Sequence, residues 1–128
     1  MKNAPATVHS EAAPKAIGPY SQAVIAGDLV FISGQIPLDP ATGNLIADDF
    51  PAEVERVLAN VDAVLLAAGC DRSRVVKATV FVTDLSLFAT LNDIYGRFFG
   101  EHRPARAVVQ VSALPRGARV EMEAVALR

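Results

Sequence analysis

The sequence is poor in cysteine, in aromatic residues and in surplus positive charge, and each shortage excludes a class of function. Its single cysteine, Cys70, excludes an intramolecular disulfide and a thiolate metal cluster. Lys and Arg number 12 against 14 Asp and Glu, a formal net charge of -2, so no basic surplus is available to hold a phosphate backbone. Aromatic residues make up only 6% of the chain, which leaves little for stacking nucleic-acid bases. Nucleic acid is therefore not expected as the main partner.

Long apolar runs are also missing. No run approaches the roughly 18 residues of a membrane span, and Met1 to Pro19 lacks the apolar segment that a signal peptide needs. We expect a soluble, cytoplasmic protein without a membrane partner. With 128 residues, 52% of them apolar and 20% charged, the chain has the size and composition of one domain that buries a core. We expect this domain to span residues 1–128.

The first half of the chain predicts an arm, a hairpin and a helix. Met1 to Ala16, rich in Ala and Pro, is typical of a loose arm or edge segment. Tyr20–Ala26 and Leu29–Ser33 favour strands, and Gly27-Asp28 between them predicts a hairpin turn. A helix is predicted over Pro51–Ala68, ending before Gly69, because apolar residues follow at helical spacing: Val54, Val57, Leu58, Val61, Val64 and Leu65.

The second half predicts three strands and another helix. Val75–Thr83 is dense in β-branched residues, and alternation along it would place Val76, Val80 and Val82 on one face, opposite Val75 and Phe81. A helix is predicted over Ser86–Phe99. Two further strands, Ala107–Val111 and Arg119–Leu127, are predicted as a hairpin around the turn at Pro115 to Gly117. The order β-β-α-β-α-β-β indicates an α+β fold.

This order leaves one face of the sheet without a covering layer. Two helices can cover only one face, and the strand over Val75–Thr83 has apolar side chains on both faces. A chain of this length has no third layer to offer. We therefore expect self-association, with sheets packing against sheets across subunits.

Arg106 is the first candidate for chemistry. It opens an apolar strand, where a charge is costly to bury unless it meets an anion. One interpretation is a guanidinium fork that grips a ligand carboxylate. The other is a strand-end arginine in solvent, or one paired with a structural carboxylate.

Glu121 is the second candidate. The last strand alternates charged and apolar residues, which usually means a solvated outer face, yet Val125 and Leu127 continue the charged face. A carboxyl group at such a boundary could have a raised pKa and act as an acid or base. Whether Arg106 and Glu121 share a face depends on the strand register, which a slip of one residue would reverse.

The remaining candidates each have a plain structural interpretation as well. Ser33-Gly34 could offer a bare backbone amide to an anion, or be a turn. Tyr20 follows Gly18-Pro19 and could serve only in packing. Asn92, on the second helix, could cap, pack or reach a cleft. Neither the helix-end Cys70 nor the two distant histidines have the context of a nucleophile or a metal site.

Five segments, taken together and in this order, carry a resemblance to a known family. They cover nearly the whole chain: Ala16–Ala23 (AIGPYSQA), Phe31–Pro37 (FISGQIP), Val76–Leu85 (VKATVFVTDL), Pro104–Arg106 (PAR) and Val120–Ala126 (VEMEAVA). At this chain length they resemble the RidA/YjgF family, whose older name is endoribonuclease L-PSP.

The resemblance implies a chorismate-mutase-like (YjgF) fold that assembles as a homotrimer, with an inner β-barrel, helices outside and a cleft between each pair of subunits. It also implies a 2-iminobutanoate/2-iminopropanoate deaminase. Such an enzyme hydrolyses reactive 2-imino acids, formed from enamines that pyridoxal-phosphate enzymes release, to 2-keto acids and ammonia. A protonated imine is already electrophilic, so no metal or cofactor is expected.

The resemblance also implies roles for single residues. Arg106 would grip the substrate carboxylate, Tyr20 would hydrogen-bond it, and Glu121 would activate a water. A second group would line the cleft or position ligand and water: Ser33, Asn92 and the backbone at Gly34 and Val108. This mechanism requires Arg106 and Glu121 to face each other at an inter-subunit cleft, and not to lie on different sides of the β-layer.

The sequence departs from the best-studied branch of the family in two places. Val108 stands where that branch often has cysteine, which excludes a thiol-based redox response there. Gly100 to Arg103 is shorter than the corresponding segment, which bears on the cleft rim and on side-chain preference. Two other functions stay open at this point: an RNA-directed endoribonuclease or translation inhibitor, and a non-catalytic trimer that binds carboxylate ligands.

Overall fold

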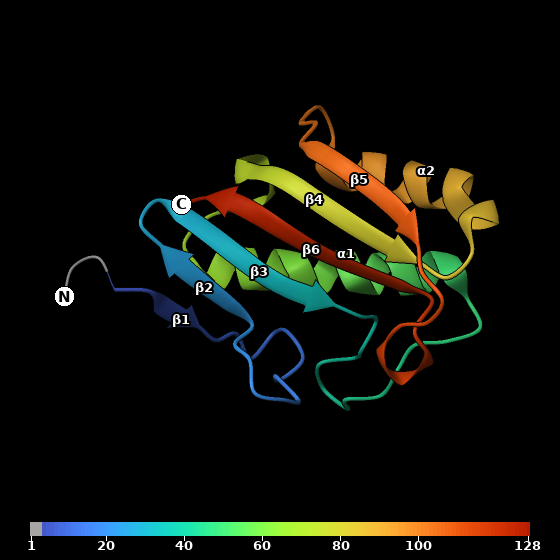
Figure 1. Ribbon diagram of the computed structural model, residues 1–128, viewed down its shortest axis with the longest axis horizontal. Coiled ribbons are helices and arrows are strands. Elements are labelled where there is room, and N and C mark those ends of the chain that lie inside the picture. Colours follow the sequence, from blue (N-terminus) through green and yellow to red (C-terminus); the bar gives the residue numbers. More distant parts are fainter. Residues whose placement is uncertain (1–3) are drawn as a thin grey trace.

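The computed structural model describes residues 4–128 as one mixed sheet with two long helices on one side of it (Figure 1). The elements follow one another as β1 (Ala6–Val8), β2 (Ala23–Ala26), β3 (Leu29–Gln35), α1 (Phe50–Ala67), β4 (Val75–Val82), α2 (Phe88–Phe99), β5 (Ala105–Gln110) and β6 (Val120–Leu127), with short 3-10 turns at Arg72–Arg74, Leu85–Leu87 and Pro115–Gly117. The predicted order β-β-α-β-α-β-β and the α+β class are confirmed. The N-terminal arm adds one edge strand, β1, to that order.

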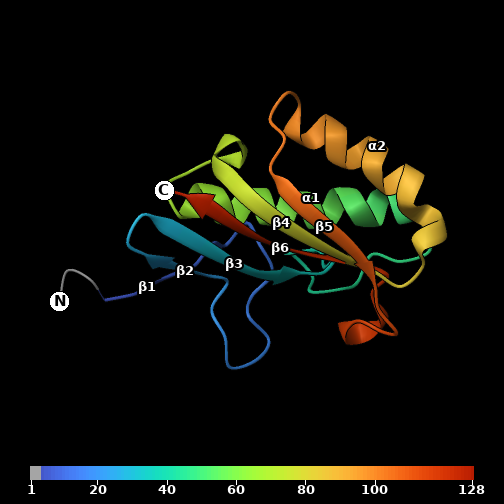
Figure 2. The same cartoon turned by 45° about the horizontal axis from the view of Figure 1, so that its top comes forward.

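The strands lie in the order β1-β2-β3-β6-β4-β5, and all neighbours are antiparallel except β4 and β5. Both helices pack on the same face, which Figures 1 and 2 show from two directions. The prediction that the helices cover only one face is therefore confirmed. Neither helix combines the length and hydropathy needed to cross a membrane, and no other helix among residues 4–128 does.

Helix α1 forms where its caps and its apolar spacing predict it. The Asp49 side chain accepts a hydrogen bond from the backbone N–H of Ala52, so it satisfies one of the free donors of the first turn. All six predicted apolar positions are buried against the sheet. Gly69, at φ +84°, ends the helix in a conformation that side chains rarely adopt.

The predicted hairpin between β5 and β6 is wrong. β6 lies between β3 and β4, and β5 pairs in parallel with β4 instead. A parallel pair needs a crossover connection, and α2 supplies it between β4 and β5. The turn at Pro115–Gly117 therefore carries the chain across β4 to the centre of the sheet.

The predicted facing of the β4 residues is also wrong at one end. Val75 is fully buried and Val76 is 41% exposed, while Val80 and Val82 are buried on the helix face. The pairing of β4 with β6 shifts register between Val75 and Lys77, and such a bulge exchanges the faces of the residues before it.

The face without helices carries large apolar side chains in the open. Leu29, Phe31, Val109 and Leu127 are between 36% and 46% exposed. Phe31 lies opposite Val125 in the β3–β6 pairing and Leu29 opposite Leu127, so the side chains of β3 and the end of β6 form one patch, whereas Val109 lies apart from it, beside Phe81. A patch of this kind marks a surface that meets another molecule.

Candidate active site

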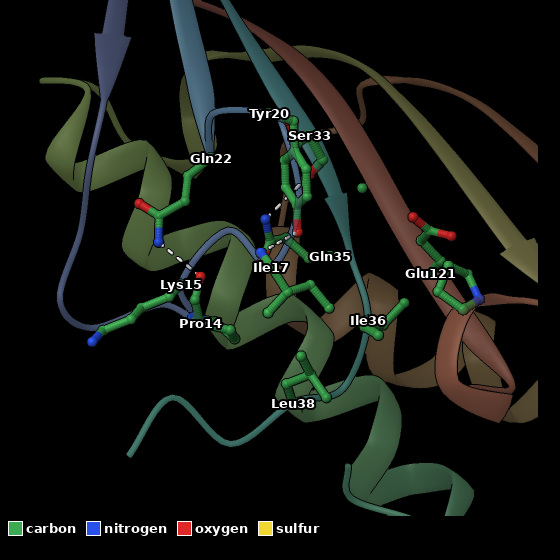
Figure 3. Close-up of a pocket in the computed structure, with 12 residues that line it drawn as sticks. Pro14, Lys15, Ile17, Tyr20, Gln22, Ser33, Gln35, Ile36, Leu38 and Glu121 are labelled. Carbon is green, nitrogen blue, oxygen red and sulfur yellow. Dashed lines mark hydrogen bonds between the residues drawn. The ribbon is translucent and has the colours of Figure 1, made fainter. Parts of the chain in front are cut away.

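A cavity of about 350 Å³ opens beside the ends of β3 and β6, under the loop that precedes β2 (Figure 3). Four of the predicted site residues line it: Tyr20, Ser33, Gly34 and Glu121. Apolar side chains make up much of the remaining wall: Pro14, Ile17, Ile36, Leu38 and Pro115. We call this cavity with its lining the Glu121 pocket.

Gln22 holds the loop that forms the outer wall of the pocket. This side chain is 2% exposed. Its amide oxygen accepts from the backbone N–H of Ser10 at 2.6 Å, and its amide nitrogen donates to the carbonyls of Ser10 at 3.1 Å and Pro14 at 2.8 Å. Buried hydrogen bonds of this kind are costly to leave unmade. The wall is therefore fixed from inside by one residue.

Tyr20 lies in this loop and not in a strand, so the predicted strand over Tyr20–Ala26 begins three residues too early. Its side chain is 47% exposed at the mouth of the pocket. The hydroxyl of Ser33 donates to the carbonyl of Ser21 at 2.6 Å, and the Ser33 N–H donates to the Gln22 carbonyl at 3.0 Å. These bonds join the Tyr20 loop to β3.

Gly34 is where the sheet makes room for Glu121. The β3–β6 pairing shifts register between Ile32 and Gln35, so Gly34 lies in a bulge within β3 and does not follow the end of the strand. A Cβ atom at Gly34 would overlap the Glu121 carboxyl group. Only a glycine therefore lets this carboxyl group lie against the backbone of β3 at the wall of the pocket.

The Glu121 carboxyl group lies at a boundary between wet and dry surroundings, as predicted. Burial raises its pKa, and the negative charge of Glu123 raises it further. A carboxyl group with a raised pKa is a stronger base than an ordinary glutamate, so it is better suited to take a proton from water and return it.

The start of β6 is anchored two residues before Glu121. The Arg119 guanidinium donates to both oxygens of Glu53, at 3.1 Å and 2.5 Å. Glu53 lies in the first turn of α1 and is 2% exposed. A two-pronged pair of this kind fixes direction as well as distance, so α1 sets the position from which Glu121 extends.

Arg106 lies on the other side of the sheet. In the pairing of β4 with β5 it stands beside Ala78, whose side chain is fully buried under the helices, whereas Glu121 stands beside Phe81 on the face without helices. Because alternate residues point to opposite faces, the two side chains diverge. The register, which the sequence left open, thus puts Arg106 and Glu121 on different sides of the β-layer of one chain, and the two could face each other only across a contact between two copies.

The surroundings of Arg106 are aromatic. Its guanidinium carbon lies 4.8 Å from the ring centre of Tyr95 and 5.7 Å from that of Phe88, both on α2. It pairs with no carboxylate of residues 4–128. Of the two structural interpretations for this arginine, pairing with a carboxylate of the same chain is thus excluded for the described residues.

Asn92 and Val108 belong to the Arg106 side. Val108 stands beside Val80 on the helix face and packs against the core. The side-chain oxygen of Asn92 is buried and has no hydrogen-bond partner among residues 4–128. The predicted site residues thus form two groups, four in the Glu121 pocket and three along β5 and α2.

Other candidate groups take structural places. The buried Cys70 thiol donates to the Leu65 carbonyl, and burial raises its pKa, which lowers its reactivity. His102 contacts the Val75 carbonyl through Nε2 at 2.6 Å. Within residues 4–128 no three His, Cys, Asp or Glu side chains gather as metal ligands do.

Three features of the site escaped prediction: the anchor Gln22, the apolar wall with Ile17 and Leu38, and the pair of Glu53 with Arg119. Gln22 is a polar residue directly before an apolar strand, and this position was a signal for a buried polar anchor. The wall and the ion pair join segments far apart in the chain, and no local pattern marks them.

The segments that build the pocket and the Arg106 edge fall inside one family match. Residues 10–128 match the model of the family described as Endoribonuclease L-PSP. The chain belongs to this family, RidA/YjgF.

Relatives and a solved structure agree with the assignment to RidA/YjgF. A protein named DfrA from Myxococcus xanthus is 58% identical over 122 residues, 94% of this chain and 93% of its own length. The 2-iminobutanoate/2-iminopropanoate deaminase of Bos taurus is 50% identical over 116 residues, 91% of this chain and 85% of its own length. The crystal structure of E. coli TdcF with bound serine superposes with a TM-score of 0.92 at 45% identity, covering 96% of this chain and 98% of that one.

Proposed function

We propose that this protein hydrolyses 2-imino acids to 2-keto acids and ammonia, and that its active sites form between the subunits of a homotrimer. The observation that carries the proposal is Glu121, a carboxyl group with a raised pKa that packs against Gly34 and lines a pocket. Relatives about 50% identical to this chain bear the name of that deaminase, and a similar protein has been solved with an amino acid bound.

The reaction needs an anchor for a carboxylate and a group that manages one proton. Arg106 supplies a guanidinium without an anionic partner among the described residues, and its planar donors match a carboxylate. Glu121 supplies the proton acceptor. Because the two point away from each other in one chain, an active site that uses both needs two copies.

In the proposed reaction Glu121 takes a proton from a water molecule as its oxygen bonds to the imine carbon. Glu121 passes this proton to the nitrogen as the C=N double bond becomes a single bond. It then takes the hydroxyl proton of the resulting aminoalcohol as the C=O bond forms, and gives it to the nitrogen, which departs as ammonia when the C–N bond breaks. Holding one water against one carbon supplies much of the rate.

The sheet surface without helices supports the assembly. It exposes Leu29, Phe31, Val109 and Leu127, and β5 runs along its free edge (Figure 1). Packing these faces together in a closed ring would bury the apolar side chains. It would also bring the β5 edge of one copy close to the pocket of another.

The activity is tested by coupling the protein to threonine dehydratase and following the appearance of 2-oxobutanoate. The unchanged protein is expected to accelerate it. Arg106→Ala is expected to abolish the acceleration while the trimer stays intact. An Arg106→Ala protein with full activity would remove the carboxylate anchor from the proposal.

The inter-subunit site is tested by mixing two inactive variants, Arg106→Ala and Glu121→Gln. If each site takes Glu121 from one copy and Arg106 from its neighbour, random mixed trimers hold about a quarter intact sites, and activity returns to about that fraction. Two variants that stay inactive in verified mixed trimers would contradict sites shared between copies.

A second candidate is cleavage of RNA, which the description of the family names. The net charge of -2 gives no general attraction to a phosphate backbone. RNA cleavage by the purified protein that disappears with Arg106→Ala would favour this candidate.

A further inference from the structure

The guanidinium of Arg106 lies against two aromatic rings and no carboxylate. Its carbon is 4.8 Å from the ring centre of Tyr95 and 5.7 Å from that of Phe88. Both distances are within the range in which a cation is attracted to the face of a ring. Contacts to ring faces leave the N–H donors at the rim of the guanidinium unused.

The two rings lie on one stripe of α2. Phe88, Asn92 and Tyr95 are spaced by four and three residues, so they lie one above the other on the same face of the helix. Since Arg106 contacts both rings at the ends of this stripe, Asn92 lies between its two aromatic neighbours. Its side-chain oxygen is buried without a partner within residues 4–128.

The hydroxyl of Tyr95 makes no hydrogen bond within residues 4–128 that would explain why a tyrosine stands at this position. Tyr95 is 6% exposed, and its hydroxyl oxygen has no hydrogen-bond partner in the described part of the chain. Burial raises the pKa of the phenol, so the group is neutral. A buried hydroxyl without a partner reduces stability, and what Tyr95 contributes at this place is its ring.

We infer that Tyr95 and Phe88 are positioning residues for carboxylate recognition: their rings hold the Arg106 guanidinium in one orientation, with its N–H donors free for the carboxylate of the substrate. This inference rests on the proposed function. A long side chain at the edge of a sheet otherwise samples many rotamers, and fixing it beforehand lowers the entropy lost when a ligand binds.

The two rings differ in a way that separates positioning from folding. Phe88 is 40% exposed, whereas Tyr95 is in the core. Phe88→Leu therefore removes one ring at little cost to stability. Tyr95→Leu removes the other ring but also leaves a core defect. Tyr95→Phe keeps the ring and removes only the unpartnered hydroxyl.

Phe99→Leu is the matched control for the core defect. The Phe99 ring packs 4.8 Å from that of Tyr95 and is equally buried, at 5% exposure, but no contact of Phe99 with the Arg106 guanidinium is found among the described residues. It should lower stability about as much as Tyr95→Leu does, without disturbing Arg106.

The experiment measures binding of 2-oxobutanoate to the assembled protein by calorimetry, together with KM and kcat for imine hydrolysis. Phe88→Leu and Tyr95→Leu are expected to weaken binding about 3- to 10-fold each, with a matching rise in KM and little change in kcat. Tyr95→Phe should bind within about twofold of the parent, since this variant keeps the ring.

Two results would overturn the inference: parent-like binding in both leucine variants, or a Phe99→Leu protein that loses as much affinity as Tyr95→Leu. A parent protein that neither binds 2-oxobutanoate nor hydrolyses imines would contradict the proposed function instead. In that case, NMR relaxation of the Arg106 Nε–Hε group tests whether the two rings hold the guanidinium. The order parameter of this group should fall in Phe88→Leu and stay unchanged in Tyr95→Phe. An unchanged order parameter in Phe88→Leu would overturn the inference.

Discussion

The two halves of the proposed site are built in different ways. The Glu121 pocket is enclosed: Gln22 fixes its outer wall, Gly34 makes room for the carboxyl group, and the pair of Glu53 with Arg119 sets the start of β6. The Arg106 side is open, at the edge of the sheet, and its guanidinium lies against rings instead of ionic partners.

This difference follows from what each group must do. A general base needs a defined direction and a partly dry place, because its pKa decides its protonation near neutral pH. An anchor for a carboxylate needs free donors, and an ionic partner from its own chain would compete with the ligand. A backbone bulge and buried hydrogen bonds serve the first need, and aromatic packing at a free edge serves the second.

The largest expected effect tests the room that Gly34 leaves. Gly34→Ala places a methyl group where the Glu121 carboxyl group lies, so the carboxylate has to move. We expect the imine-hydrolysis rate to fall about 100-fold or more, as for other displacements near 1 Å. Binding of 2-oxobutanoate through Arg106 should weaken far less. The control is Gly96→Ala, since a methyl group there meets nothing within 4 Å. A fully active Gly34→Ala protein would show that the position of the Glu121 carboxyl group does not depend on Gly34, and would contradict the contrast between an enclosed Glu121 pocket and an open Arg106 side.

The next effect concerns the wall of the pocket. Gln22→Met keeps the volume and leaves the polar backbone groups of Ser10 and Pro14 unpaired. The free energy of unfolding should fall by about 2–4 kcal/mol, since each buried group without a partner costs about 1–3 kcal/mol. Denaturant unfolding measures the loss, and hydrogen exchange should rise around Ser10 more than in β5. Equal exchange in both regions would show that the wall is not held separately.

The third prediction uses the raised pKa of Glu121. A base that holds its proton more tightly works only above that pKa, so the activity should rise with pH along a limb whose midpoint lies above the ordinary value of a glutamate. Glu121→Gln should lose the activity at every pH, so it serves here as the reference for stability. The same shift means that charging Glu121 disfavours the folded state, so the parent should lose stability relative to the variant as the pH rises from the ordinary glutamate pKa through the raised one, and the difference should stay constant above it. A midpoint at the ordinary glutamate value would contradict a partly dry pocket.

The smallest effect concerns the support of β6. Asp49→Ala removes the cap at the start of α1, next to the turn that carries Glu53. The free energy of unfolding should fall by about 1 kcal/mol, read from chemical denaturation. The acid limb of the activity should keep its midpoint, because the Glu121 carboxyl group and Gly34 are untouched. A shifted midpoint would show that the start of α1 influences the Glu121 carboxyl group, which would contradict this expectation.

Local patterns were enough to predict much of this protein. The apolar spacing from Val54 to Leu65 placed α1 within one residue at each end, and Gly27-Asp28 placed the turn between β2 and β3. Alternation along β6 put Glu121 between wet and dry surroundings. The predicted residues of the pocket came from a resemblance carried by contiguous segments, and a contiguous motif can be recognised in the sequence without knowledge of the fold.

The tertiary structure alone decided how these pieces meet. Strand order depends on pairing between distant segments, so no local signal showed that β6 lies between β3 and β4. Side-chain facing changes at every residue of a strand, so it was the register that put Arg106 and Glu121 on opposite faces of one chain. One bulge exchanged Val75 and Val76, and another opened the place for the carboxyl group at Gly34. The sequence by itself determined which groups are available, and the register of the sheet decided which of them one chain can bring together.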